Sequence, residues 1–263
     1  MGRRTGILGG TFDPIHVGHL FVATEAARAL ALDEVLLLPS RTPPHRPVDP
    51  STSVFQRFAM VALAASTNAR LVASDLELLR QGPSYTADTL RMLHTAGHEA
   101  WQLFFLAGAD AFAEIATWRD YPAVLDLAHF VVCSRSGTPA TSLPAALPDL
   151  ARRMVPVNMA HGHPGAPFDF AQGRKATGLR KPGAEAGRAR AVALQGTHTR
   201  IFLLDCPTPD VSSTDIRARA RAGRPLAGLV PPEVDHYIRR HGLYGASSGA
   251  ASAGRPAAGN LHE

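Results

Sequence analysis

The sequence has few of the features that mark secreted, membrane-spanning or zinc-binding proteins. Its 263 residues include only two cysteines, Cys133 and Cys206, and neither has a second cysteine at metal-ligand spacing. We therefore expect two buried thiols rather than redox or metal-binding groups. No run approaches the length of a membrane span, and no apolar signal segment precedes the first apolar run at residues 6–8. These absences predict a cytoplasmic protein with no membrane partner.

Most of the chain also has no excess of positive or negative charge. The formal net charge is +5, but residues 171–190 alone hold six Arg and Lys residues against Glu185. The rest of the chain is therefore about neutral. A Gly-, Ala- and Arg-rich segment of this kind favours a solvated loop over a nucleic-acid-binding arm, so we do not expect nucleic acid as a partner. A basic nucleic-acid-binding module remains an alternative function, of a different class from an enzyme.

Short apolar runs alternate with segments of helical period along most of the chain. Unbroken apolar runs are typical of strands covered on both faces, and their alternation with helices predicts βαβ units. The fold class is therefore α/β, a Rossmann-like, doubly wound and mainly parallel sheet with helices on both faces. Strands are expected at 6–8, 35–38, 71–73, 103–106, 130–132 and 201–204, and helices at 17–31, 53–66, 85–96, 109–117 and 213–222.

We predict a single domain over residues 1–244. The pattern fails from about 136 to 198, and 160–197 is expected to be a basic, Gly/Ala/Arg-rich insertion or loop. Residues 245–263 are of low complexity and are expected to be a disordered tail. A G-x-S-x-G pattern at 245–249 has no strand before it and no helix after it, so we do not interpret it as a nucleophile elbow.

The stretch GGTFDPIHVGHL at residues 9–20 joins the first expected strand to the first expected helix. Gly9 and Gly10 let backbone N–H groups approach an anion closely. His16 and His19 fall at the helix N-terminus, and their i, i+3 spacing places both rings on one side. Because the helix dipole favours a nearby anion, we expect imidazoles that donate hydrogen bonds to phosphate. A metal pair and two capping or core histidines are the alternatives.

The stretch DVSSTDIRARARAG at residues 210–223 predicts a second anion site. Ser212 with Asp215 fits a capping box, and Ser213, Thr214 and Arg217 follow in the first turns of the helix. Taken alone, this is also the pattern of an ordinary capped helix with a surface arginine. Two such sites after the first and last strands of one parallel sheet favour a polyphosphate ligand.

With both stretches in view, the chain resembles the nucleotidylyltransferase superfamily, which carries HxGH and SSTxIR signatures. Further stretches are similar to nicotinate-nucleotide adenylyltransferases, and together they cover about 1–135 and 199–244. The resemblance implies that the adenylyl group of ATP passes to nicotinate mononucleotide, giving nicotinate adenine dinucleotide and pyrophosphate in NAD biosynthesis. These stretches are PSRTPPHR (39–46), QRFAMVALA (56–64), GPSYTADTL (82–90), FFLAGADAFAEIATW (104–118) and VPPEVDHYIRRHGLY (230–244).

The resemblance also implies which residues meet ATP. Catalytic roles fall on His16, His19 and Arg217, with His19 closest to the transferring phosphorus. Mg²⁺ is implied as a cofactor carried by the ATP phosphates, and no protein metal ligands are expected. A ligand role for Asp110 has the N-cap of the next helix as its alternative. The full ATP-binding set is Gly9, Gly10, Thr11, Phe12, His16, His19, Gly108, Asp110, Arg135, Ser213, Thr214 and Arg217.

On the acceptor side, the resemblance implies that nicotinate mononucleotide is the second substrate. His45 and Arg46 would meet its phosphate with help from Arg57, and the amides of Tyr85 and Thr86 would bind its carboxylate. Trp118 would stack on the pyridine ring. The alternatives are an exposed Pro-rich loop for His45 and Arg46 and a core position for Trp118. A related enzyme that uses nicotinamide mononucleotide or another phosphorylated acceptor is the nearest rival function, and a homo-oligomer stays open.

Overall fold

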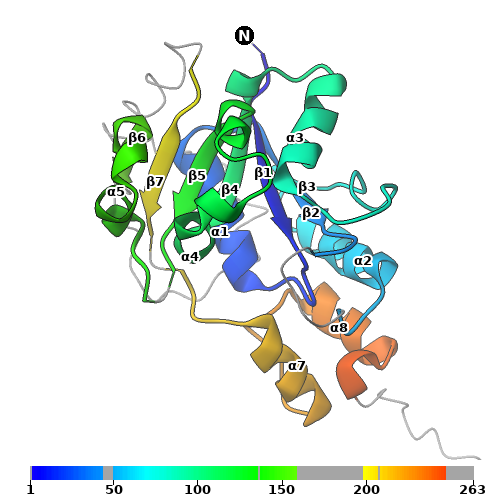
Figure 1. Cartoon of the computed structure of the whole chain (residues 1–263). Coiled ribbons are helices and arrows are strands. Elements are labelled where there is room, and N and C mark those ends of the chain that lie inside the picture. Colours follow the sequence, from blue (N-terminus) through cyan, green and yellow to red (C-terminus); the bar gives the residue numbers. More distant parts are fainter. Residues whose placement is uncertain (1, 44–49, 136, 159–197, 207, 247–263) are drawn as a thin grey trace, which may run out of the picture.

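Seven parallel strands form one sheet in the computed structural model, which describes residues 2–43, 50–135, 137–158, 198–206 and 208–246 (Figure 1). The strand order is β3-β2-β1-β4-β5-β7-β6, and every neighbouring pair runs parallel. This confirms the expected fold class and all six expected strands. The strands are β1 (Thr5–Gly10), β2 (Glu34–Pro39), β3 (Leu71–Ala73), β4 (Leu103–Gly108), β5 (His129–Cys133), β6 (Met154–Asn158) and β7 (Ile201–Asp205).

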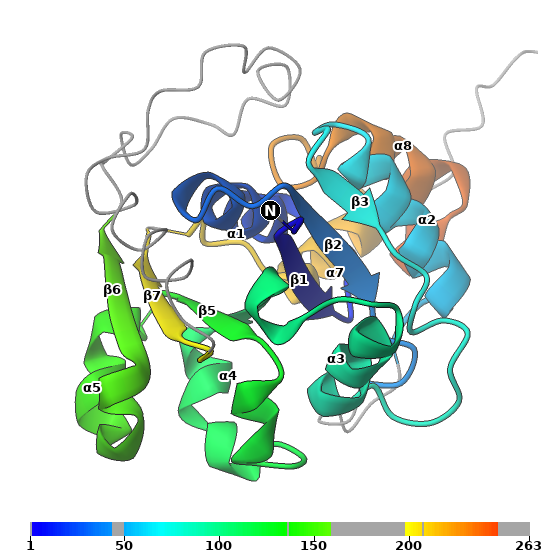
Figure 2. The ribbon, with the colours of Figure 1, turned by 90° about the horizontal axis from the view of Figure 1, so that it is seen from above.

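Helices cover both faces of the sheet, as Figure 2 shows. One core cluster holds buried residues of α1, α2, α7 and α8, and a second holds those of α3, α4 and α5. This two-sided burial explains why the central strands are apolar without alternation. The helices are α1 (Val17–Ala29), α2 (Val54–Ala65), α3 (Thr86–Thr95), α4 (Ala109–Ala113), α5 (Leu143–Ala146), α7 (Ser213–Arg221) and α8 (Pro232–Arg240).

The chain reverses its direction of winding between β1 and β4. Strands β2 and β3 follow β1 on one side, whereas β4, β5, β7 and β6 continue on the other. In an open parallel sheet, the crevice outside the carboxyl ends of the strands at such a point is the usual ligand site. The glycine turn after β1 and Gly108 at the end of β4 both lie there.

Three details differ from the sequence expectations. The edge strand β6 was not predicted, because its sequence MVPVN carries a proline that only an edge position tolerates. The expected helix over 109–117 is shorter, since α4 ends at Ala113 and a 3₁₀ turn follows at Ile115–Thr117. Periodicity also missed α8.

The two cysteines are free and buried, as expected. Burial raises the pKa of the Cys133 thiol well above its usual value and that of Cys206 to about 12, so both stay protonated at neutral pH. Among the described helices, none has the length and apolarity to cross a membrane. The expected insertion at 160–197, with its basic segment, and residues 247–263 of the expected tail lie outside the described residues. Gly245 and Ala246, also predicted to be disordered, are described, and Ala246 is buried in the core.

Candidate active site

A cavity of about 900 Å³ opens at the carboxyl ends of β1, β4 and β5, where the strand order reverses. Two of its walls carry the residues singled out by sequence. We call the turn of residues 9–19 the β1–α1 wall. We call the start of α3 together with the segment after the 3₁₀ turn Ile115–Thr117, residues 84–88 and 118–119, the α3 wall. The first residues of α7 lie beside the β1–α1 wall.

The β1–α1 wall folds tightly because of its glycines. A Cβ at Gly10 would lie 3.0 Å from the ring of Phe12, a buried residue with a positive φ of 49°. A Cβ at Gly18 would lie 3.1 Å from the His16 imidazole. The glycine between the two histidines of HVGH therefore leaves room for the first ring to lie against the helix.

The two histidines stack on each other at the start of α1. Their ring centroids are 3.7 Å apart with an interplanar angle of 28°, and Phe12 meets His19 edge-on at 5.0 Å. The backbone N–H of His16 donates to Nδ1 of His19 at 3.3 Å. Nδ1 of His19 is thus an acceptor, and in the neutral ring the proton lies on Nε2. Both rings line the cavity, which confirms their expected placement at the helix N-terminus.

His16 is neutral at physiological pH. Burial and the nearby Arg135 guanidinium lower its pKa to about 4. Its Nδ1 is buried and has no hydrogen-bond partner among the described residues. A buried polar atom without a protein partner beside a cavity suits a ligand that supplies one. Within the described residues, no group of three or more His, Cys, Asp and Glu side chains could hold a metal ion.

The start of α7 lies next to this pair. The Ser212 hydroxyl caps the helix by accepting from the backbone N–H of Asp215 at 3.1 Å, which confirms the expected cap. Ser212 and Ser213 line the cavity, whereas Thr214 and Arg217 lie outside its lining. Arg217 instead donates to the Asp13 carbonyl oxygen at 2.7 Å. In this structure it joins α7 to the β1–α1 wall.

Asp13 ties the β1–α1 wall to two other segments, a role that sequence reasoning missed. Its carboxylate is buried and accepts from Ser51 N–H at 2.7 Å, the Thr52 hydroxyl at 2.8 Å and the Tyr244 hydroxyl at 2.9 Å. Burial and the Asp13 charge raise the pKa of Tyr244 above its usual range, which keeps its hydroxyl a donor. The only sequence signal was an acidic residue next to Pro14 in an otherwise apolar turn.

Gly108, Asp110 and Arg135 close the cavity near β4 and β5. Arg135 pairs with Asp110 at 3.1 Å, and both side chains are about half exposed. A Cβ at Gly108 would lie 2.4 Å from an Asp110 carboxyl oxygen, so the Asp110 side chain could not keep this position beside a larger residue. The N-cap of α4 is Gly108, which makes the alternative of Asp110 as the N-cap wrong.

The α3 wall presents the residues expected for the second ligand. Tyr85 is the N-cap of α3 and Thr86 its first residue, and both line the cavity. The first amides of a helix have no acceptor within it and are suited to bind an anion. Trp118 also lines the cavity, and its indole meets Phe105 at 6.1 Å and Phe130 at 6.3 Å, both near edge-on. Trp118 therefore packs against core aromatic residues and also borders the cavity, so the core interpretation of this residue is partly correct.

The remaining expected residues lie elsewhere. Arg57 is fully buried outside the cavity lining, and it donates to the Thr11 carbonyl oxygen at 2.6 Å and the Arg41 carbonyl oxygen at 3.4 Å. It thus supports the turn that carries the histidines. His45 and Arg46 lie outside the described residues. Their expected contact with a phosphate stays a prediction.

Comparison with known proteins agrees with this geometry. The model of the Cytidylyltransferase-like family matches residues 7–219. A probable nicotinate-nucleotide adenylyltransferase from Desulfatibacillum aliphaticivorans is 37% identical over 92% of this chain and 99% of its own length. Another from Chromobacterium violaceum is 37% identical over 93% of this chain and 100% of its own length.

A solved structure shares the fold at much lower identity. Plasmodium falciparum nicotinic acid mononucleotide adenylyltransferase complexed with NaAD superposes with a TM-score of 0.60 and 15% identity, covering 93% of this chain and 98% of that one. Both curated relatives match nearly the whole chain. The seven-stranded sheet and the stacked histidines at the switch point are consistent with these matches. The chain belongs to the nicotinate-nucleotide adenylyltransferase family.

Proposed function

We propose that the protein transfers the adenylyl group of ATP to nicotinate mononucleotide, as the names of its relatives indicate. The observation that carries the proposal is the single cavity at the switch point, with the His16–His19 pair on one wall and the start of α3 on the other. One wall suits a polyphosphate and the other suits an aromatic ring that bears a carboxylate. The two ligands would meet within the same enclosure.

The reaction needs no side-chain nucleophile. A phosphate oxygen of the mononucleotide attacks the α-phosphorus of ATP, a new P–O bond forms, and the bond to the β-phosphate oxygen breaks. The electron pair of that bond leaves with pyrophosphate. The attacking phosphate is already ionised at neutral pH, so the protein has to position the two groups and stabilise the charge that develops.

The β1–α1 wall supplies that stabilisation. The Nε2–H of His19 donates to the phosphate at the reacting centre, because its Nδ1 is held by the His16 amide. Neutral His16 adds a second polar contact without the repulsion that two stacked imidazolium rings would cause. The backbone amides at Gly9 and Gly10 add phosphate contacts. The Ser213 hydroxyl, which donates to the Pro14 carbonyl oxygen at 2.9 Å, and Arg217 would turn from their backbone acceptors to join them when the ligand is bound.

Mg²⁺ fits this site as a companion of ATP rather than a resident ion. The described residues lack a carboxylate cage for it, so the phosphates and waters would supply its ligands. When bound, the ion neutralises part of the phosphate charge. Asp110 would accept a hydrogen bond from a ribose hydroxyl of the nucleotide.

A paired assay tests the proposal. The protein is incubated with ATP and Mg²⁺ and with either nicotinate or nicotinamide mononucleotide, and dinucleotide and pyrophosphate are quantified. We expect faster formation of the nicotinate dinucleotide. A protein that shows a cooperative thermal unfolding transition but forms no dinucleotide from nicotinate mononucleotide would contradict the proposal, and a preference for the amide would assign it to the rival function.

A further inference from the structure

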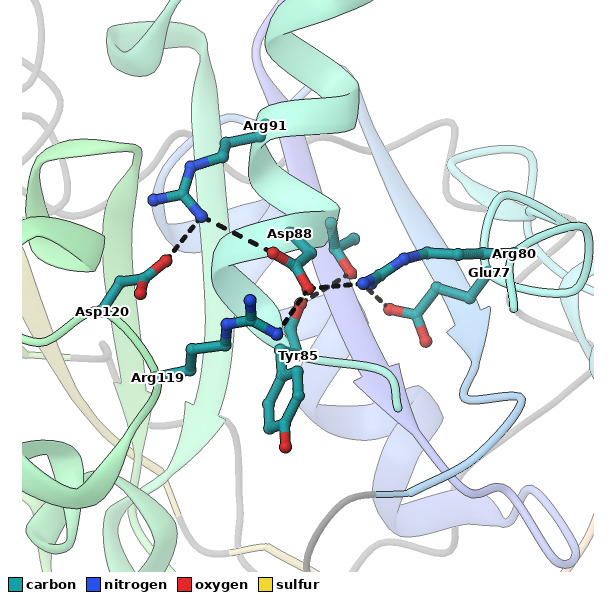
Figure 3. A network of polar contacts seen from close by, with 8 residues as sticks. Glu77, Arg80, Tyr85, Asp88, Arg91, Arg119 and Asp120 are labelled. Atoms are coloured by element: carbon teal, nitrogen blue, oxygen red, sulfur yellow. Dashed lines mark hydrogen bonds and ion pairs between the residues drawn. The ribbon is translucent and has the colours of Figure 1, made fainter. Parts of the chain in front are cut away.

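Asp88, in the first turn of α3, is the centre of a cluster of ion pairs beside the cavity (Figure 3). Its carboxylate contacts guanidinium groups from three different segments. Arg80 lies before α3, Arg91 lies one turn further along α3 at 3.6 Å, and Arg119 follows Trp118 and lies at 3.4 Å. Arg91 also pairs with Asp120 at 2.6 Å. The cluster therefore ties the start of α3 to the segment that carries the tryptophan.

Arg119 brings this cluster to the cavity. Its guanidinium carbon lies 4.9 Å from the centroid of the Tyr85 ring, and Arg119, Tyr85 and Trp118 all line the cavity. Figure 3 shows the Arg119 guanidinium between the Tyr85 ring and the Asp88 carboxylate. The ion pair with Asp88 and the ring contact with Tyr85 thus fix one long side chain from two directions.

A third carboxyl group, that of Glu77, borders the cluster on the side of the cavity (Figure 3). Glu77 lies at its edge, accepts from the Thr89 hydroxyl at 2.7 Å and is only 6% exposed. Burial is the main cause that raises its pKa, and the Thr89 and Ser84 hydroxyls and the Arg80 charge act in the opposite direction. Its second carboxyl oxygen has no partner among the described residues, although Glu77 lines the cavity. The three guanidinium groups form their ion pairs with Asp88 and Asp120.

We propose that Asp88 is a positioning residue that holds Arg119 over Tyr85, and that this arrangement makes the α3 wall select a pyridine ring bearing a carboxylate over one bearing an amide. The inference rests on the proposed function, because it assumes that the ring binds at Trp118. A carboxylate at the start of α3 gains from both the helix N-terminus and the fixed guanidinium, whereas a neutral amide gains less from either.

A role of Asp88 through its charge alone and a role in positioning Arg119 predict opposite effects of Asp88→Asn. If Asp88 acted only through its charge, Asp88→Asn would raise the positive potential and tighten binding of nicotinate mononucleotide. If it positions Arg119, the same substitution releases the guanidinium into solvent and weakens that binding. We expect Asp88→Asn to raise KM for nicotinate mononucleotide about fivefold, since an ion pair with a half-exposed arginine such as Arg119 contributes little, and to leave KM for ATP unchanged.

The experiment compares kcat/KM for the two mononucleotides in the wild type, Asp88→Asn, Arg119→Gln and a control. Asp235→Asn is the matched control, because Asp235 also lies in the first turn of a helix, α8, and pairs with Arg239 at 2.8 Å. We expect Asp88→Asn and Arg119→Gln to lower the preference for nicotinate by similar factors and the double variant to add little. Asp235→Asn should keep the wild-type preference.

The outcomes separate this inference from the proposed function. A wild type that makes no nicotinate dinucleotide removes the function. A wild type that makes it, with an unchanged preference in Asp88→Asn or a lower KM for the acid, overturns only the inference. Equal losses with both mononucleotides and a higher KM for ATP would show a purely structural role for Asp88 and would also overturn it.

Discussion

The two walls of the cavity are each organised around one carboxylate, but the surroundings of the two carboxylates differ. Asp13 in the β1–α1 wall is buried and accepts from an amide and two hydroxyls that belong to residues 51, 52 and 244. Asp88 in the α3 wall meets three arginines, of which Arg91 and Arg119 are about half exposed. Water reaches the Arg91 and Arg119 partners of Asp88, whereas Asp13 is only 2% exposed and its partner Tyr244 is buried.

This difference suits the separate tasks of the walls. The wall that stabilises charge at the reacting phosphorus gains from rigid donors that need no rearrangement during the reaction. The wall that recognises the acceptor can use charge that the solvent partly screens, because it only has to distinguish two ligands. The following predictions test the contrast, beginning with the largest effect.

His19→Ala should have the largest effect, and it should fall on turnover. Loss of one donor aimed at developing charge typically costs about 10²- to 10³-fold in kcat. The free energy of unfolding should change little, since the ring lines a cavity. Steady-state kinetics and thermal unfolding measure both, and His236→Ala on the exposed side of α8 is the control. Turnover near that of the wild type would remove the phosphate role of His19.

Replacing Asp13 should lower the free energy of unfolding more than replacing Asp88. Asp13→Ala removes the acceptor of three donors, of which the Tyr244 hydroxyl is buried, and we expect a loss of about 3 kcal/mol in the free energy of unfolding. Asp88→Ala should lose about 1 kcal/mol or less, because its arginines reach water. Urea unfolding of the two variants measures the difference. Equal losses would break the comparison.

A fall in pH should lower the stability of the folded protein, because His16 in the β1–α1 wall has a lowered pKa. The pKa of His16 is lowered to about 4 in the folded protein, against about 6.5 for an unfolded chain. Between these values the unfolded state binds more protons, so stability falls as the pH drops from 6.5 toward 4. Buried His129, whose pKa is also lowered to about 4 by burial and Arg200, adds to the same trend.

Urea unfolding at pH 7 and pH 4.5 tests this, with His16→Asn as the comparison. The variant should lose less stability than the wild type over this range and keep the part due to His129. If the two proteins lost the same amount, the lowered pKa of His16 would be wrong.

Tyr244→Phe should have a small effect, and it tests whether the segment after α8 supports the β1–α1 wall. The substitution removes one hydrogen bond to Asp13 and keeps the packing of the ring, so we expect a loss of about 1 kcal/mol in stability. A severalfold fall in kcat without a change in KM for the acceptor would link the segment after α8 to the wall that carries the histidines. Tyr237→Phe on α8 is the control.

Much of this architecture follows from short sequence signals. The unbroken runs LFFL and FVV predicted buried parallel strands, and the glycine turn with HVGH predicted two histidines at a helix N-terminus after the first strand. The cap at Ser212 was also foreseen, because it depends on residues three apart. Such patterns can be predicted because the interactions that they encode join residues close together in the sequence.

The contacts that organise the walls could not be predicted in the same way. Asp13 and Tyr244 are 231 residues apart in the sequence, and Asp88 meets Arg119 across 31 residues. Arg57 and Arg217 resembled phosphate ligands, but in this structure their guanidinium groups bond to backbone carbonyls. Only tertiary packing decides which acceptor such a side chain reaches.

The fate of labelled phosphate tests the central claim most directly. The protein is incubated with nicotinate mononucleotide, Mg²⁺ and ATP labelled either at the α-phosphate or at the γ-phosphate, and the products are separated. We expect the α-label in the dinucleotide and the γ-label in pyrophosphate, with both signals lost in His19→Ala. Transfer of the γ-label to the mononucleotide, or an α-label that never enters a dinucleotide, would contradict attack at the α-phosphorus in this cavity.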